Sequence, residues 1–162
     1  MPFAGRPPEK IVAAAIAAIG RIARIEAASV LHHFPAWPDP ADPPFVNAAA
    51  AISAGLGPEP LLAALQGIEA GFGRRRSRRN EPRTLDLDLL DYRGLIRQPA
   101  DPEGLALPHS RLAEREFVLA PLVEIAPDWR HPATGATARD LLSCLREGRP
   151  PPRRPELLRC NS

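Results

Sequence analysis

A short stretch of the chain alternates leucine with polar residues, and two of the polar residues are aspartates. The stretch is Pro-Arg-Thr-Leu-Asp-Leu-Asp-Leu-Leu-Asp at residues 82–91, with Thr84, Asp86 and Asp88 on one side of a period-two strand and leucines on the other. Same-face neighbours on a strand lie roughly 6.5–7 Å apart. Two carboxylates at that spacing can lean towards the same one or two cations, and oxygen ligands of this kind suit Mg²⁺.

Arginines crowd the residues just before the aspartates. Six of them lie in residues 74–83, namely Arg74, Arg75, Arg76, Arg78, Arg79 and Arg83. Carboxylates for a metal and guanidinium groups for phosphate together predict phosphoryl chemistry on a nucleotide. The alternative interpretation of residues 82–91 is an amphipathic strand with a solvated polar face. Against it, aspartate is a poor strand residue, and two like charges on one face repel each other.

The composition fits one soluble globular domain. The chain has 162 residues, of which 44% are hydrophobic and 25% charged, and its formal net charge of +2 is too small to indicate a nucleic-acid partner. Neither Cys144 nor Cys160 belongs to a Cys-x-x-Cys pair, which is typical of a reduced protein. The sequence shows no membrane-spanning run and no apolar signal core, so we expect a cytoplasmic protein without a membrane partner.

Hydrophobic periodicity predicts helices at residues 9–24 and about 58–72, and strands at 25–33, 45–54 and 82–91. This order favours an α+β fold with a mostly antiparallel sheet. In the second helix we expect a core stripe of Leu61, Leu65, Ile68 and Phe72, with Gln66 and Glu69 on a separate polar face. Residues 1–146 are predicted to form the domain, and the Pro- and Arg-rich residues 147–162 a disordered tail.

Three blocks of the sequence carry distinctive motifs: Pro-Arg-Thr-Leu-Asp-Leu-Asp-Leu-Leu, then Leu-Pro-His-x-Arg-Leu-x-x-Arg-x-Phe-Val-Leu-x-Pro-Leu, then Glu-Ile-Ala-Pro-Asp-Trp. Together they resemble one enzyme family, the 6-hydroxymethyl-7,8-dihydropterin pyrophosphokinases of folate biosynthesis. In this order and spacing the blocks are specific, and the resemblance covers about residues 9–142. It implies a ferredoxin-like antiparallel sheet with helices packed on it, and transfer of pyrophosphate from ATP to the pterin with release of AMP.

The resemblance also implies roles for individual residues. Asp86 and Asp88 would hold two Mg²⁺ ions, and Arg74 and Arg83 would be the catalytic arginines. The nucleotide-contacting positions would be Gln66, Glu69, Arg74, Arg76, Arg83, His109 and Arg115. The pterin-contacting positions would be Pro35, Trp37, Phe45, Asn47 and Phe117, with the two phenylalanines stacking on the ring. The partners would be the small molecules ATP and pterin, acting on a monomer that binds no nucleic acid.

Members of that family begin with a strand of the type Ala-Leu-Gly-Ser-Asn, and Met1-Pro2-Phe3 stands where that strand should already have ended. We therefore expect the first strand to be missing, which would deprive residues 82–91 of a ladder partner and leave the chain poorly stable or inactive. One alternative function is an impaired homologue that still binds nucleotide or pterin. A weaker one is a nucleic-acid module using residues 74–83, because Glu81 interrupts that patch and no aromatic residue lies in it.

Overall fold

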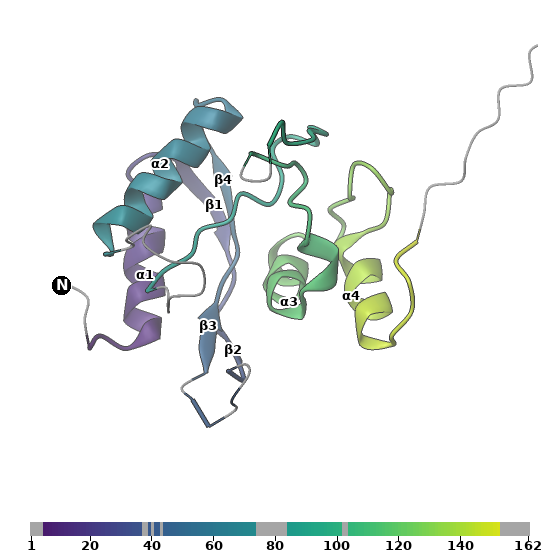
Figure 1. Cartoon of the computed structure of the whole chain (residues 1–162), viewed down its shortest axis with the longest axis horizontal. Coiled ribbons are helices and arrows are strands. Elements are labelled where there is room, and N and C mark those ends of the chain that lie inside the picture. Colours follow the sequence, from purple (N-terminus) through teal and green to yellow (C-terminus); the bar gives the residue numbers. More distant parts are fainter. Residues whose placement is uncertain are drawn as a thin grey trace, which may run out of the picture.

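The computed structural model describes residues 5–36, 39, 41–42, 44–73, 84–101 and 104–152. These residues form a mixed α and β structure whose sheets are antiparallel, which confirms the predicted α+β class. Figure 1 shows two halves lying side by side: the sheet half, residues 5–92, and the helical half, residues 104–152. None of the described helices is long and apolar enough to cross a membrane.

The sheet half contains two helices and four short strands. Its elements are α1 (Pro8–Ile19), β1 (Arg24–Ala28), β2 (His32–Phe34), β3 (Phe45–Asn47), β4 (Ala50–Ser53) and α2 (Pro58–Gly71). Both helices carry proline in their first positions, where the missing N–H breaks no intrahelical bond. β1 pairs with β4 and β2 pairs with β3, all antiparallel, so the four strands form two consecutive parts of one ribbon.

The first helix ends five residues earlier than the sequence predicts. The sequence predicts a helix to residue 24, but α1 stops at Ile19 and the chain turns through residues 20–23. Gly20 favours this end because glycine is costly inside a helix. The amides of Arg21 and Ile22 then bond three residues back, in a tight turn that leads into β1. Ile22 still packs against the core formed around Ile19, but from outside the helix.

The prediction of two continuous strands at residues 25–33 and 45–54 is wrong, because each of these segments forms two shorter strands. The break lies at Ser29–Leu31 on one side of the ribbon and at Ala48–Ala49 on the other. The Ser29 hydroxyl accepts the Ala49 N–H at 3.0 Å, and the Val30 N–H donates to a side-chain carboxylate of the helical half at 2.9 Å. The Ser29 N–H still donates to the Ala49 carbonyl at 2.9 Å, but side chains take the place of the next backbone partners and the ladder stops.

Residues 84–91 keep the predicted alternation but not the predicted strand. Leu85 is buried and Leu87 and Leu89 are partly buried in the cores beneath α1 and α2, whereas Asp86 and Asp88 are exposed. Within the part of the chain that the structure describes, no strand ladder includes this segment. Its backbone instead bonds to a side chain and a loop: the Leu87 N–H donates to a carboxylate of α2, and the Leu90 carbonyl accepts from a loop N–H.

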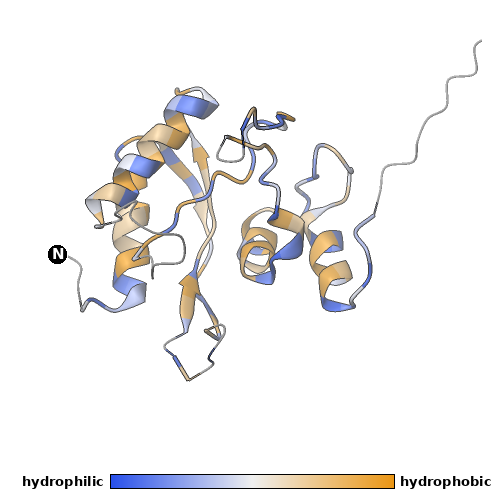
Figure 2. Ribbon diagram, in the orientation of Figure 1, coloured by the Kyte–Doolittle hydropathy of each residue, from blue (hydrophilic) through white to orange (hydrophobic). Residues whose placement is uncertain are grey.

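The helical half consists of a 3-10 turn, η1 (Leu112–Glu114), and the helices α3 (Glu116–Ile125) and α4 (Ala138–Arg146). Leu112, Leu119 and Leu141 form the centre of its core, and Leu90 packs against it from the connecting segment. Figure 2 shows hydrophobic residues along α3 and hydrophilic residues at the outer end of α4. The domain boundary at residue 146 stays a prediction, and the predicted tail is described only as far as residue 152.

Candidate active site

Asp88 lies at the junction of the two halves and faces two basic side chains of the helical half. Its carboxylate oxygens are 3.8 Å from Nε2 of His109 and 3.9 Å from Nη1 of Arg115. Both distances are longer than a hydrogen bond, so the attraction is electrostatic and the oxygens keep lone pairs for another ligand. The structure thus brings together one predicted metal ligand and two predicted nucleotide contacts.

His109 is held in one orientation by backbone bonds. The backbone N–H of His109 donates to the Leu90 carbonyl at 2.8 Å, which ties the loop to the aspartate segment. Its ring Nδ1 accepts the N–H of Arg111 at 3.2 Å. Because Nδ1 is an acceptor, the proton of the neutral imidazole is assigned to Nε2, the nitrogen that faces Asp88.

The sequence predicts that Glu69 shares a polar face of α2 with Gln66, and this prediction is wrong. It is 1% exposed and shares the buried stripe of α2 with Leu61 and Leu65, while Gln66 is half-buried. Its Oε1 accepts the Leu87 N–H at 2.6 Å, directly between the two aspartates. The spacing of four residues from Leu61 to Leu65 to Glu69 was the available sequence signal. Glu69 therefore fixes the backbone that carries Asp86 and Asp88, and its predicted contact with nucleotide stays a prediction.

Asp86 and Asp88 form a pair of exposed carboxylates on one side of the segment. Within the described residues, no group of three or more His, Cys, Asp or Glu side chains could hold a metal ion. A closed protein cage, such as a structural zinc site, is thus not built from this part of the chain. Two carboxylates do fit Mg²⁺, which commonly takes one or two of them and completes its shell with water and substrate phosphates.

An exposed aromatic ring lies next to this charged cluster, and a second exposed ring lies on β3. Phe117 is 40% exposed and Phe45 is 56% exposed. The Arg115 guanidinium lies 5.5 Å from the centre of the Phe117 ring, which joins the aromatic surface to the Asp88 cluster. Exposed phenylalanine rings suit stacking on a flat ligand.

Phe34 belongs to the same surface and was missed by the sequence analysis. Its ring meets Phe117 edge to face, with centroids 6.3 Å apart and an interplanar angle of 69°. It is also the register partner of Phe45 across β2 and β3. Its place immediately before Pro35, itself a predicted pterin contact, was the only local signal.

The remaining predicted residues divide between the ribbon and the undescribed segments. Asn47 is half-buried opposite His32, and Pro35 is exposed at the end of β2. The predictions made for Trp37, Arg74, Arg76 and Arg83 lie outside the described residues.

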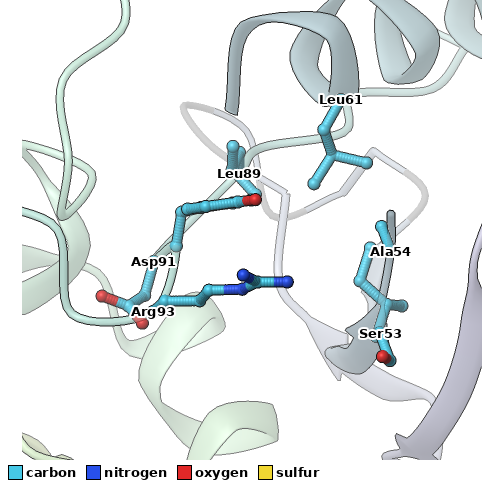
Figure 3. Close-up of a pocket in the computed structure, with 8 residues that line it drawn as sticks. Ser53, Ala54, Leu61, Leu89, Asp91 and Arg93 are labelled. Atoms are coloured by element: carbon cyan, nitrogen blue, oxygen red, sulfur yellow. The ribbon is translucent and has the colours of Figure 1, made fainter. Parts of the chain in front are cut away.

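A separate small pocket lies on the other side of the aspartate segment. It has a volume of about 150 Å³ and is lined by residues including Leu61, Leu89, Asp91 and Arg93. Figure 3 shows Leu61 reaching towards it from α2, across from Leu89 and Asp91. Because it shares no residue with the cluster around Asp88, we do not assign the nucleotide chemistry to it.

One carboxylate that faces a histidine and an arginine, with a second carboxylate two residues away and an exposed aromatic ring beside the arginine, fits phosphoryl chemistry on a nucleotide. The family model described as 7,8-dihydro-6-hydroxymethylpterin-pyrophosphokinase matches residues 5–127. The chain belongs to this family. It is thus a transferase of folate biosynthesis, and membership implies ATP as co-substrate and a small-molecule pterin as acceptor.

Curated relatives carry the same description. The 2-amino-4-hydroxy-6-hydroxymethyldihydropteridine pyrophosphokinase of Methylorubrum extorquens is 45% identical over 122 residues, covering 75% of this chain and 74% of the relative. The protein of that name from Pseudomonas aeruginosa is 46% identical over 110 residues, covering 67% and 66%. The one from Synechocystis is 42% identical over 103 residues, covering 64% of this chain but only 51% of the relative. The chain thus spans from about half to three quarters of the length of these relatives.

Proposed function

We propose that this chain transfers the β,γ-pyrophosphoryl group of ATP to 6-hydroxymethyl-7,8-dihydropterin. The hydroxymethyl oxygen would form a bond to the β-phosphorus, and the bond from that phosphorus to the oxygen bridging it to the α-phosphorus would break. AMP leaves with the bridging oxygen, and the hydroxyl proton is released. The observation that carries the proposal is the position of Asp88, which faces His109 and Arg115 beside the exposed Phe117 ring.

Asp86 and Asp88 are the proposed holders of Mg²⁺, and we expect two ions. The bound metal would neutralise charge on the transferring phosphates. The chain's own task is to hold the two carboxylates in place, which the bond from the Leu87 N–H to Glu69 supports. Transfer of this kind depends mostly on positioning and on charge neutralisation.

The substrates would lie on opposite sides of this metal site. His109, Arg115 and Gln66 are proposed to contact the nucleotide, together with Glu69, Arg74, Arg76 and Arg83. On the pterin side, Phe45 and Phe117 would stack on the ring and Asn47 would bond to its polar edge, with Pro35 and Trp37 nearby. We expect the protein to act as a cytoplasmic monomer, without a nucleic-acid partner.

The arginine assignment is tested by comparing three single variants. Arg74→Ala and Arg83→Ala should each lower pterin-dependent AMP release by about 10²-fold or more, the usual effect of removing a group that stabilises transition-state charge. Arg78→Ala, from the same segment, is the matched control and should change the rate little. Equal losses at all three positions would point to a nonspecific basic patch, for which binding of nucleic acid should weaken steeply as salt rises.

We also infer that a further strand pairs with residues 85–90 in a ferredoxin-like sheet. The support is that this segment is extended and places leucines on one side, as a strand would. Among the described residues, however, no strand pairs with it. A version of the chain extended upstream by about ten residues, enough for a strand and a short connection, should melt at a higher temperature and be more active. Equal stability and activity of both forms would contradict this arrangement.

A further inference from the structure

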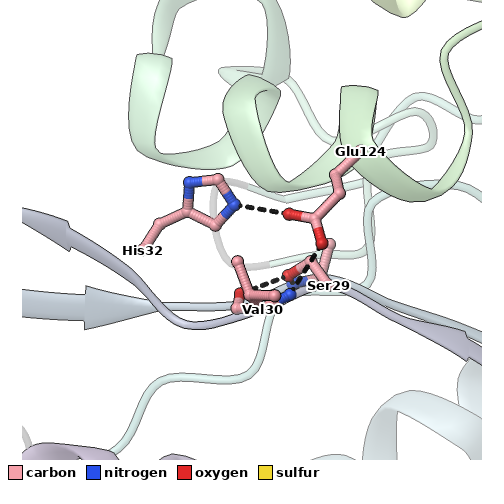
Figure 4. A network of polar contacts seen from close by, with 5 residues as sticks. Ser29, Val30, His32 and Glu124 are labelled. Atoms are coloured by element: carbon pink, nitrogen blue, oxygen red, sulfur yellow. Dashed lines mark hydrogen bonds and ion pairs between the residues drawn. The ribbon is translucent and has the colours of Figure 1, made fainter.

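Glu124, on α3, joins the helical half to the interrupted ribbon of the sheet half. Its Oε1 accepts the Val30 N–H at 2.9 Å, and its Oε2 lies 2.8 Å from Nε2 of His32 (Figure 4). Both distances are those of good hydrogen bonds. The ribbon's ladder is broken where this carboxylate takes the Val30 N–H, so Glu124 substitutes for a strand partner at the break.

The ionisation of Glu124 agrees with this role. The Val30 N–H, and after it the bond to His32, lower the pKa of the Glu124 carboxyl below its ordinary value. Hydrogen bonds that lower a carboxyl pKa favour its charged form. The clamp, by which we mean Glu124 with Val30 and His32, is therefore made by an ionised carboxylate at neutral pH.

The same helix and strand meet again through aromatic rings. The His32 ring stacks near that of Phe34, with centroids 6.4 Å apart and an interplanar angle of 14°, and Phe34 in turn meets Phe117. Glu124 and Phe117 are two turns apart on one side of α3, a rise of about 10 Å. His32 and Phe34 are alternate residues and share one face of β2. The helix and the strand are thus fixed to each other at two points, one polar and one aromatic.

We propose that Glu124 is a positioning residue that sets the spacing between Phe117 and the ribbon end bearing Phe45 and Asn47. This inference rests on the proposed function, because that spacing is the gap in which the pterin ring would stack. Glu124 itself does not touch the pterin. Without the clamp, the ribbon is free to bend at Ser29–Leu31, where its ladder is already interrupted, and the gap loses its fixed width. The nucleotide-side cluster of Asp88 and His109 does not involve the ribbon, so ATP binding should be spared.

The test compares Glu124→Ala and Glu124→Gln with Glu116→Ala as matched control. Glu116 lies on the same helix and forms an ion pair with Arg146 at 2.8 Å, away from the ribbon. KM values for pterin and ATP, pterin Kd by titration calorimetry, and Tm are measured for each variant. Glu124→Ala should weaken pterin binding about tenfold, or ~1.4 kcal/mol, and change the KM for ATP by no more than about twofold. Glu124→Gln should restore most of the pterin affinity, because its amide oxygen still accepts the Val30 N–H.

His32→Ala removes half of the clamp and supplies a second variant if Glu124→Ala does not fold. It should give a smaller loss in the same direction, again in pterin affinity rather than in KM for ATP. Two results would overturn the positioning role of Glu124. One is an equal weakening of pterin and ATP binding, and the other is that Glu124→Ala has the same KM and Kd values as Glu116→Ala. Neither result would contradict the proposed function, provided that AMP release still depends on pterin. Absence of pterin binding and AMP release in both the unmodified chain and its upstream-extended form would instead overturn the proposed function, and this inference with it.

Discussion

In the helical half, Leu112, Leu119 and Leu141 are almost completely buried in one cluster, whereas the sheet half divides its buried residues between two smaller clusters. The helical half also begins α4 with a capping box, in which Thr137 and Asp140 bond to each other's backbone N–H groups. Neither α1 nor α2 has a side-chain cap. In the helical half α3 has no side-chain cap either, so among the described helices α4 alone has this local start signal, and the other three helices depend on packing contacts.

The candidate active site lies where these two halves meet. Asp86 and Asp88 come from the sheet half, and His109, Arg115 and Phe117 come from the helical half. The halves are joined by apolar packing of Leu90 and by polar bonds across the junction. The geometry of the site therefore depends on how the halves dock, more than on the stability of either one.

A leucine deletion in each half would show whether the halves unfold together. Leu119→Ala in the helical half and Leu61→Ala in the sheet half should each cost about 2–5 kcal/mol, because both side chains are almost fully buried. We expect one shared transition in urea, since the aspartate segment contributes to the cores of both halves. Two transitions, with each variant shifting only its own, would show that the halves are independent domains.

Removal of the Glu69 carboxylate should have a smaller effect on stability. Glu69→Ala leaves the Leu87 N–H without this acceptor, which costs about 1–3 kcal/mol for a buried donor. Glu69→Gln keeps an oxygen at that place and should recover part of the loss. Urea unfolding gives the free energies, and amide exchange at Leu87 reports the bond directly. Unchanged exchange at Leu87 in Glu69→Ala would contradict the bracing role.

Loss of the cap on α4 should cost less again. Thr137→Ala removes the acceptor of the Asp140 N–H and should lower the free energy of unfolding by about 1 kcal/mol. Because α4 packs on α3 rather than on the sheet half, the pterin affinity should not change. A loss of pterin affinity in this variant would mean that the two halves are coupled through α4 as well.

The smallest expected effect is a pH dependence that comes from His131. Its Nδ1 is buried without a hydrogen-bond partner among the described residues, and burial lowers its pKa below 6.5, opposed in part by the nearby Asp91 charge. Between the pKa of His131 in the folded state and its higher pKa in the unfolded state, the unfolded chain binds more protons. The contribution of His131 to the free energy of unfolding is therefore fully present above about pH 6.5 and is lost as the pH drops below that value. In the His131→Phe variant, this contribution to the pH dependence of the urea midpoint should disappear. The check is to measure urea midpoints at a series of pH values on both sides of about pH 6.5. An unchanged slope would show that other groups cause it.

The sequence predicted the class of fold and the alternation at residues 84–91, because both follow from the spacing of apolar residues. It did not predict the breaks in the ribbon. They arise from long-range bonds of Ser29 to Ala49 and of Val30 to Glu124, which no local pattern announces. Glu69 was misplaced for a related reason, since a charged residue in a helix is normally expected on the exposed face.

The site was predictable where residue types and motifs carried it, as for Asp88, His109 and Arg115, which the structure brings together. Phe34 was missed because a lone phenylalanine before proline has no distinctive chemistry until Phe117 is brought against it by the packing of α3 on β2. Glu69 and Phe34 were thus hidden from the sequence because their roles depend on contacts between distant segments.

The central claim is tested most directly by measuring AMP formed from ATP and Mg²⁺ with and without 6-hydroxymethyl-7,8-dihydropterin. The unmodified chain, or its upstream-extended form, should release AMP only when the pterin is present. Asp86→Ala should lower that rate by about 10²-fold or more while the fold is retained, and Asp128→Ala, an exposed aspartate outside the site, should leave it unchanged. Pterin-dependent AMP release that survives in Asp86→Ala at near the normal rate would contradict the account.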